Sequence, residues 1–162
     1  YTLSLHDALP ISTSAAHQLT IDTNTPGFAI VLTSDDQMRQ QSTPGATVCP
    51  GDGSSSDICL PNAQVPGMST QNSAVWNNHT ASGLGYTQEL AQADDAQVLR
   101  FDYLNGYRHF PDSSNAQAPA LILHTLTGTY SDSYLCYRLV AKPTNLNGIY
   151  RNQLTYSAYP LF

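Results

Sequence analysis

The cysteines are the residues of this chain whose spacing points most directly to a chemical bond. Cys49 and Cys59 flank PGDGSSSDI, a polar, turn-rich loop that contains few side chains able to order it. A disulfide across this loop would stabilise the fold by roughly 3 kcal/mol and indicates an oxidising compartment. Two unpaired thiols are the alternative, whereas a zinc site lacks a second Cys or His pair at ligand spacing. Cys136, in SYLCYRL, is expected to be a small buried hydrophobic residue.

The histidines and carboxylates form no recognisable catalytic or metal-binding pattern. Beyond the first twelve residues the histidines are widely separated along the chain, at His17, His79, His109 and His124. Asp94 and Asp95 are adjacent, so on an extended chain they would point in opposite directions rather than face each other as a glycosidase requires. Asp52 and Asp57 lack the ligand spacing and terminal Glu of an EF-hand. We therefore expect no enzymatic activity, no cofactor and no metal site.

Aromatic residues offer a second kind of chemistry, because binding sites for small ligands are commonly lined by aromatic side chains. The chain contains 10 tyrosines. Four rings are candidates for contact with a sugar: Trp76, Tyr86, Tyr103 and Tyr107. Exposed together on one face beside Asp or Asn, they would form a carbohydrate-binding site. The other interpretation is that they fill the core and its rim, as aromatic residues commonly do in β-proteins.

The overall composition restricts the class of protein. Charged residues make up 11% of the chain and the formal net charge is -6, whereas a nucleic-acid partner requires a clustered basic surface. No apolar run is long enough to span a membrane. There is one Glu (Glu89) and one Lys (Lys142), while Ser, Thr, Asn and Gln are abundant, which favours strands and turns over helices.

Alternating apolar residues predict the strands that must position these side chains. Residues 17–33 predict two strands around a turn at residues 24–27. Leu19 and Ile21 alternate with polar neighbours before the turn, and Phe28 begins a second alternation after it. The two strands could form a hairpin, or the turn could be a corner between two sheets. Further strands are predicted at residues 83–90, 97–104, 119–130, 133–142 and 148–158. The fold class is therefore all-β, an antiparallel Ig-like β-sandwich with a long disulfide-stapled loop.

The first twelve residues, YTLSLHDALPIS, resemble the translation of a short-read sequencing adapter. We therefore expect residues 1–12 to be a non-native segment and exclude them from functional interpretation. Residues 13–162 are expected to form a single β-sandwich domain, which is a usual length for one domain.

Two segments resemble bacterial cell-surface β-sandwich proteins of the WxL type and secreted proteins of candidate-phylum bacteria. The first segment is YRLVAKPTNLNGIYRNQLTYSAYPLF, which contains a strand, a Pro-containing loop ending in Gly, and an alternating strand. The second segment is NTPGFAIVLTS, near the beginning of the chain. The resemblance implies secretion and a sandwich fold. Trp76 stands in VWNNHT without the partner Leu of the WxL motif, so peptidoglycan binding is not implied.

These patterns together predict a secreted structural protein of the bacterial surface. We expect a subunit of an extracellular filament or coat in which a strand of one copy completes the sheet of the next. The candidate donor strand carries His17, Leu19 and Ile21. The expected partner is another copy of the same chain, with no nucleic acid and no membrane span. The alternative is a monomeric adhesin or carbohydrate-binding module that uses the aromatic residues above on a cell-surface or glycan ligand.

Overall fold

The computed structural model describes residues 2–5, 12–22, 24–41, 49, 58–77, 81–90, 106–126, 129–142 and 148–162. These residues form strands joined by turns and one short 3-10 helix, and they include no α-helix. The elements are β1 (Thr2–Leu5), β2 (Ser12–Asp22), β3 (Gly27–Ser34), β4 (Met38–Gln40), β5 (Cys59–Leu60), β6 (Ala74–Val75), β7 (Gly83–Leu90), β8 (Gly106–Tyr107), η1 (Ser113–Asn115), β9 (Ala120–Thr125), β10 (Thr129–Val140), β11 (Gly148–Arg151) and β12 (Leu154–Leu161). A helix able to cross a membrane is absent from this described part.

The sheet formed by β12, β3 and β9 follows directly from the alternation in the sequence. In β3, Phe28, Ile30 and Leu32 are buried and the residues between them are partly exposed, as the pattern predicts. β3 is the central strand and pairs antiparallel with β12 on one side and β9 on the other. A register shift in the β9 ladder brings the consecutive residues Ile122 and Leu123 both into the core.

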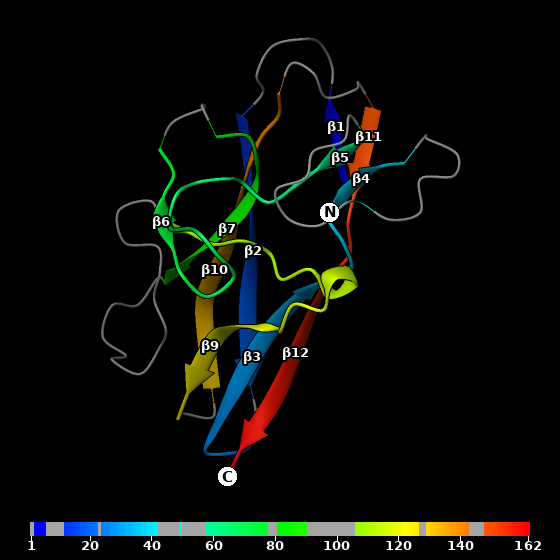
Figure 1. Ribbon diagram of the computed structural model, residues 1–162. Helices are drawn as coiled ribbons and strands as arrows, with labels where there is room; N and C mark the ends of the chain where they lie inside the picture. The colour runs from blue at the N-terminus through cyan, green and yellow to red at the C-terminus, as the bar shows by residue number, and fades with distance from the viewer. Residues whose placement is uncertain are drawn as a thin grey trace.

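A second three-stranded sheet has the order β2, β10, β7, with β10 paired antiparallel on both sides. Leu135, Tyr137 and Leu139 of β10 are buried. They belong to one continuous core cluster with Phe28 and Ile30 of the first sheet. Figure 1 shows β12, β3 and β9 in front of β2 and β10. The protein is therefore mostly β, with antiparallel sheets whose apolar faces share a single core.

The turn between β2 and β3 carries the chain from one sheet to the other. β2 pairs with β10, whereas β3 pairs with β12 and β9, so the predicted turn is a corner and not a hairpin. Thr25 Oγ1 donates a hydrogen bond to the carbonyl oxygen of Gly27 at 2.8 Å. A Cβ on Gly27 would lie 2.4 Å from the carbonyl oxygen of Thr125, so the close approach of β9 requires glycine there.

The prediction of one continuous strand over residues 148–158 is wrong. The segment divides into β11, in a four-stranded sheet of order β1, β11, β4, β5, and β12, in the sheet around β3. The break is fixed by polar contacts: Asn152 is buried and its Nδ2 donates to Ser34 Oγ at 3.2 Å. The backbone N–H of Gln153 donates to Asp35 Oδ1 at 2.8 Å.

Residues 2–5, within the segment expected to be non-native, pair antiparallel with β11 as strand β1. Ser12, the last residue of that expected segment, is the first residue of β2. The outer edge of β11 therefore accepts a further antiparallel strand.

The outer edge of β7 is covered by main-chain hydrogen bonds. Leu84 donates its N–H to Pro61 O and accepts from Ala63 N–H, both at 2.9 Å. Tyr86 N–H donates to Arg108 O at 3.0 Å, and Arg108 N–H donates back to Tyr86 O at 2.8 Å. These bonds occupy groups that an exposed edge strand would present to solvent or to another chain.

A small second core covers the outer face of the β2, β10, β7 sheet. Trp76 is 1% exposed and lies against Gly85, where a Cβ would come within 3.1 Å of the indole ring. Its Nε1 donates to Ala81 O at 3.1 Å. The Arg138 guanidinium lies 4.8 Å from the Trp76 ring centroid and 5.7 Å from that of Tyr107.

The shared core predicts a clear difference between neighbouring positions of β3. Leu32→Ala should lower the free energy of unfolding by about 2–5 kcal/mol, because Leu32 is fully buried and the substitution leaves a cavity. Val31→Ala, on the opposite face of the same strand, should cost about 1 kcal/mol or less. Urea unfolding followed by circular dichroism measures both values. Equal losses would show that the face containing Leu32 is not the buried one.

Candidate assembly site

Strand β2 forms one edge of its sheet. Its backbone is paired with β10 along its whole length, from Ser12 opposite Val140 to Asp22 opposite Thr129. On its other side no strand pairs with it among the residues that the structure describes. The predicted donor segment is thus an edge strand held by a single ladder.

The three predicted donor residues lie at alternate positions of β2, where Leu19 and Ile21 face the core and His17 is exposed. His17 is directly opposite Leu135 of β10, which is fully buried, and Leu19 is opposite Ser133. Leu19 and Ile21 are partly buried and pack against the main core cluster. The residues between them, at positions 16, 18 and 20, are exposed. This alternation follows from the two-residue period of a strand.

A chain of three polar groups connects β2 to both sheets. His17 Nδ1 and the hydroxyl of Tyr137 are hydrogen-bonded at 2.9 Å, and the rings meet edge to face with centroids 5.1 Å apart. The Tyr137 hydroxyl also bonds the hydroxyl of Tyr156 in β12. Burial raises the pKa of Tyr156, and the hydrogen bond with Tyr137 opposes part of that rise.

The ring of Tyr137 continues into the core. It stacks on Phe110, with centroids 5.8 Å apart, and Phe110 lies 4.8 Å from the ring of Tyr86. Asn62 holds the backbone of Phe110 with two hydrogen bonds, from its Nδ2 to Phe110 O at 2.9 Å and from Phe110 N–H to its Oδ1 at 3.0 Å. No pattern in the sequence indicated a role for Tyr137, Tyr156 or Asn62. His17 and Tyr137 are 120 residues apart, so no local pattern could have joined them.

The disulfide between Cys49 and Cys59 is confirmed, with Cα atoms 6.0 Å apart. The backbone N–H of Cys49 donates to Asp36 Oδ2 at 3.0 Å, so the crosslink also fixes Cys49 beside a buried carboxylate. Cys136 is not part of this crosslink and is only partly buried, whereas the sequence predicted a buried residue. It lies opposite Ala16 and Thr87 in the two ladders of β10, on the face that does not contribute to the main core.

The four aromatic candidates do not gather on one surface. Trp76 is 1% exposed, in the second core, and Tyr86 is fully buried in the main core. Tyr107 is partly exposed and packs edge to face on Trp76, with centroids 5.5 Å apart. Tyr103 lies outside the described residues. Because protein atoms cover Trp76 and Tyr86, these two rings are not available for stacking on a sugar in this structure, and the carbohydrate-binding alternative gains no support from them.

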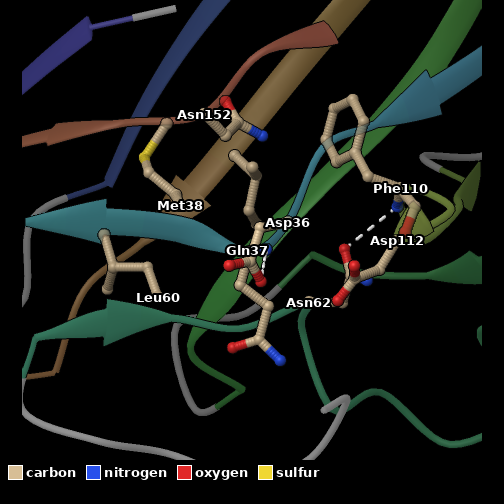
Figure 2. Close-up of a pocket in the computed structure, with 9 residues that line it drawn as sticks. Asp36, Gln37, Met38, Leu60, Asn62, Phe110, Asp112 and Asn152 are labelled. Atoms are coloured by element: carbon tan, nitrogen blue, oxygen red, sulfur yellow. Dashed lines mark hydrogen bonds between the residues drawn. The ribbon is translucent and has the colours of Figure 1, made fainter. Parts of the chain in front are cut away.

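Two buried carboxylates, not predicted from the sequence, lie beside a narrow pocket shown in Figure 2. Asp36 is 4% exposed and accepts from the N–H of Gln37 at 2.7 Å as well as from Cys49. Asp112 is 1% exposed and caps η1 by accepting from the N–H of Ser114 at 2.9 Å. The Ser114 hydroxyl bonds both carboxylates, at 3.3 Å and 2.6 Å.

The two carboxylates beside this pocket are held by protein groups. The interior of the pocket has room for no more than about one water molecule. Each carboxylate is occupied by protein N–H or O–H donors, and Arg39 lies 3.6 Å from Asp36. In the described part of the chain no three His, Cys, Asp or Glu side chains are placed to share a metal ion. The cluster therefore holds the β3–β4 turn, the η1 turn and Cys49 together.

Burial of tyrosines predicts loss of stability at alkaline pH. Burial raises the pKa of Tyr86 and of Tyr156, whereas both ionise near pH ~10 in the unfolded chain. The contribution of the two tyrosines to the free energy of unfolding is therefore complete below pH ~10 and is lost as the pH rises above it. The free energy of unfolding should fall as the pH rises above about 10, and should fall less in Tyr86→Phe. Tyr159→Phe removes the same hydroxyl from an exposed ring and is the matched control.

The disulfide predicts a definite thiol count and a loss of stability on reduction. The unreduced protein, unfolded in denaturant, should show one titratable thiol, from Cys136, and two more after reduction. Reduction, or Cys49→Ser with Cys59→Ser, should lower the free energy of unfolding by about 3 kcal/mol. Cys136→Ser is the control and should leave the disulfide intact. Three thiols before reduction would contradict the crosslink.

Comparisons of the chain with protein-family models, with curated proteins and with solved structures find no match. The resemblance to secreted surface proteins of the WxL type therefore stays a prediction. The function has to be inferred from the strands, contacts and surfaces described above.

Proposed function

We propose that this chain is a secreted structural protein of the bacterial surface, a subunit of an extracellular filament or coat whose copies join by strand complementation. The observation that carries the proposal is the position of β2, an edge strand with one ladder and with alternate side chains directed to the core. In strand complementation, main-chain hydrogen bonds provide affinity and alternate side chains provide specificity. β2 has both features within its own domain.

The acceptor for β2 is the edge of β10 and the core beneath it. Without β2, the Tyr137 hydroxyl would lose its bond to His17, and the main-chain groups of β10 along this edge would have no strand partner. The same strand from a second copy would restore each of these contacts, because the two sequences are identical. Exchange of β2 therefore costs no contact in the acceptor domain.

The fold in this proposal is an Ig-like antiparallel β-sandwich, with β2, β10 and β7 as one layer and β12, β3 and β9 as the other. The core common to the two sheets supports it. The disulfide supports secretion, because such bonds persist in oxidising compartments. The low proportion of charged residues, 11%, supports an assembling protein, because charges on strand edges oppose pairing with other chains.

The proposal predicts that a charge on the core-facing side of β2 abolishes assembly. Leu19→Asp would place a carboxylate against the core of the acceptor, whereas Thr20→Asp places the same charge on the exposed side of the strand. Electron microscopy of surface-sheared native material should show regular filaments or sheets containing this chain. Purified Thr20→Asp should form the same assemblies as the wild type, and Leu19→Asp should form none.

A peptide of residues 12–22 separates loss of assembly from loss of folding. Added during refolding of the wild type, it should occupy the β10 edge and shorten the assemblies, and the same peptide carrying Leu19→Asp should have no effect. Dispersed single particles in the native material, with no effect of either peptide on the purified protein, would contradict assembly through β2.

A further inference from the structure

We propose that exchange of β2 is reciprocal and gives a closed two-fold pair, in which two copies of the chain meet at the end of the sheets where β2 turns into β3. This inference rests on the exchange of β2 in the proposed function, since it requires β2 to leave its own domain, and it assigns growth beyond the pair to a second contact. It adds the identity of the contact surface and the number of copies that one exchange can join.

The direction of the strands places donor and acceptor at the same end of the domain. β2 ends at Asp22, opposite Thr129, the first residue of β10. β3 begins at Gly27, opposite Leu161 near the end of β12. In Figure 1 the beginning of β3 and the ends of β2 and β12 lie together at the lower end of the molecule. We call this the hinge end.

The length of the connection fixes how far a second copy can be. Four residues separate Asp22 from Gly27. Even fully extended, the chain between these two Cα atoms spans at most about 18 Å. A copy that receives β2 must therefore bring its own hinge end close to the hinge end of the donor.

This constraint favours closure over a chain of subunits. The acceptor's own β2 also leaves from its hinge end, which now faces the β10 edge that the donor has vacated. Returning it there completes both domains with one isologous, two-fold contact. In an open chain every hinge end would have to lie within about 18 Å of the hinge ends of two other copies, whereas the closed pair requires only one such approach.

The surface at the hinge end is suited to such a contact. Exposed large hydrophobic residues there are Leu126 at 56%, Tyr159 at 54% and Phe162, which is fully exposed; they are three of the five such residues in the described part of the chain. Leu126 lies directly beside Gly27, since a Cβ on Gly27 would be 2.8 Å from the Leu126 Cα. Leu161, next to Phe162, flanks Gly27 on the other side. A two-fold pair would bury this apolar surface on both copies.

Native Cys136 provides a direct test. It lies opposite Ala16 of β2 in the ladder, and both positions are on the face away from the main core. Opposite residues have Cβ atoms about 4.5–5.5 Å apart, close to what a disulfide requires. In Ala16→Cys, the new thiol should therefore crosslink to Cys136 of whichever domain holds β2. The protein is refolded at high concentration, oxidised mildly and run on a non-reducing gel.

The three outcomes of this experiment are distinct. A covalent dimer that does not extend further supports the reciprocal pair. A ladder of trimers and larger products would overturn the closed pair while retaining strand exchange. Crosslinked monomer alone would remove strand exchange itself and with it the proposed function. The matched control, Thr20→Cys, lies four residues along the same face, about 13 Å away, and should give no ladder-dependent crosslink.

A second pair of variants tests the contact surface. Leu126→Gln should raise the dissociation constant of the pair about tenfold or more, measured by sedimentation equilibrium, because it removes apolar area at the two-fold contact. Val75→Gln is the matched control, since Val75 is 52% exposed and lies on β6, far from the hinge end in Figure 1. Equal dissociation constants for the two variants would overturn the placement of the contact at the hinge end.

Discussion

The contacts of Tyr137 are the interaction on which the two sheets and the edge strand jointly depend. This residue lies in the central strand of one sheet, its ring stacks on Phe110, and its hydroxyl bonds both His17 and Tyr156. A buried hydroxyl requires partners, because an unsatisfied polar group in the core costs about 1–3 kcal/mol. His17 of β2 and Tyr156 of β12 therefore meet at the Tyr137 hydroxyl, which links the edge strand to both sheets.

The two edges of the β2, β10, β7 sheet differ: β7 is covered by main-chain hydrogen bonds, whereas β2 has no second strand partner among the described residues. On the β7 side, residues 61–63 and 106–108 cover the edge with main-chain hydrogen bonds. Trp76 and Arg138 add a second core over the face, which has room for the indole because Gly85 has no side chain. A strand from another chain could pair with the β7 edge only by displacing these segments and the second core. Removing β2 breaks one ladder, and an identical strand can repair it.

The strand alternation and the disulfide could be predicted from the sequence because each depends on neighbours along the chain. Phe28, Ile30 and Leu32 show the period of a half-buried strand, and Cys49 and Cys59 close a short loop. The break at Asn152 could not be predicted, since the apolar alternation continues across it and the turn is fixed by Ser34 and by Asp35, far away in the sequence.

The sequence was least informative about exposure. An aromatic residue in a β-protein is compatible with a binding face and with a core, and only the layer formed by residues 58–77 decides that Trp76 is covered. The buried carboxylate of Asp36 was missed for the same reason, because its donors include Cys49 and Ser114, which are 13 and 78 residues away. Sites assembled from several distant segments leave no spacing signal in the chain.

Closure of a pair through β2 has a consequence for any larger assembly. Once both β10 edges are filled, β2 can add no further copy, so a filament or coat would need a second contact. The outer edge of β11, which accepts β1, lies at the opposite end of the domain from the hinge end. Ile149 in this strand is 42% exposed even with β1 in place. A pair joined at its hinge ends would carry two such edges, and exchange of β1 between pairs would extend the assembly in both directions.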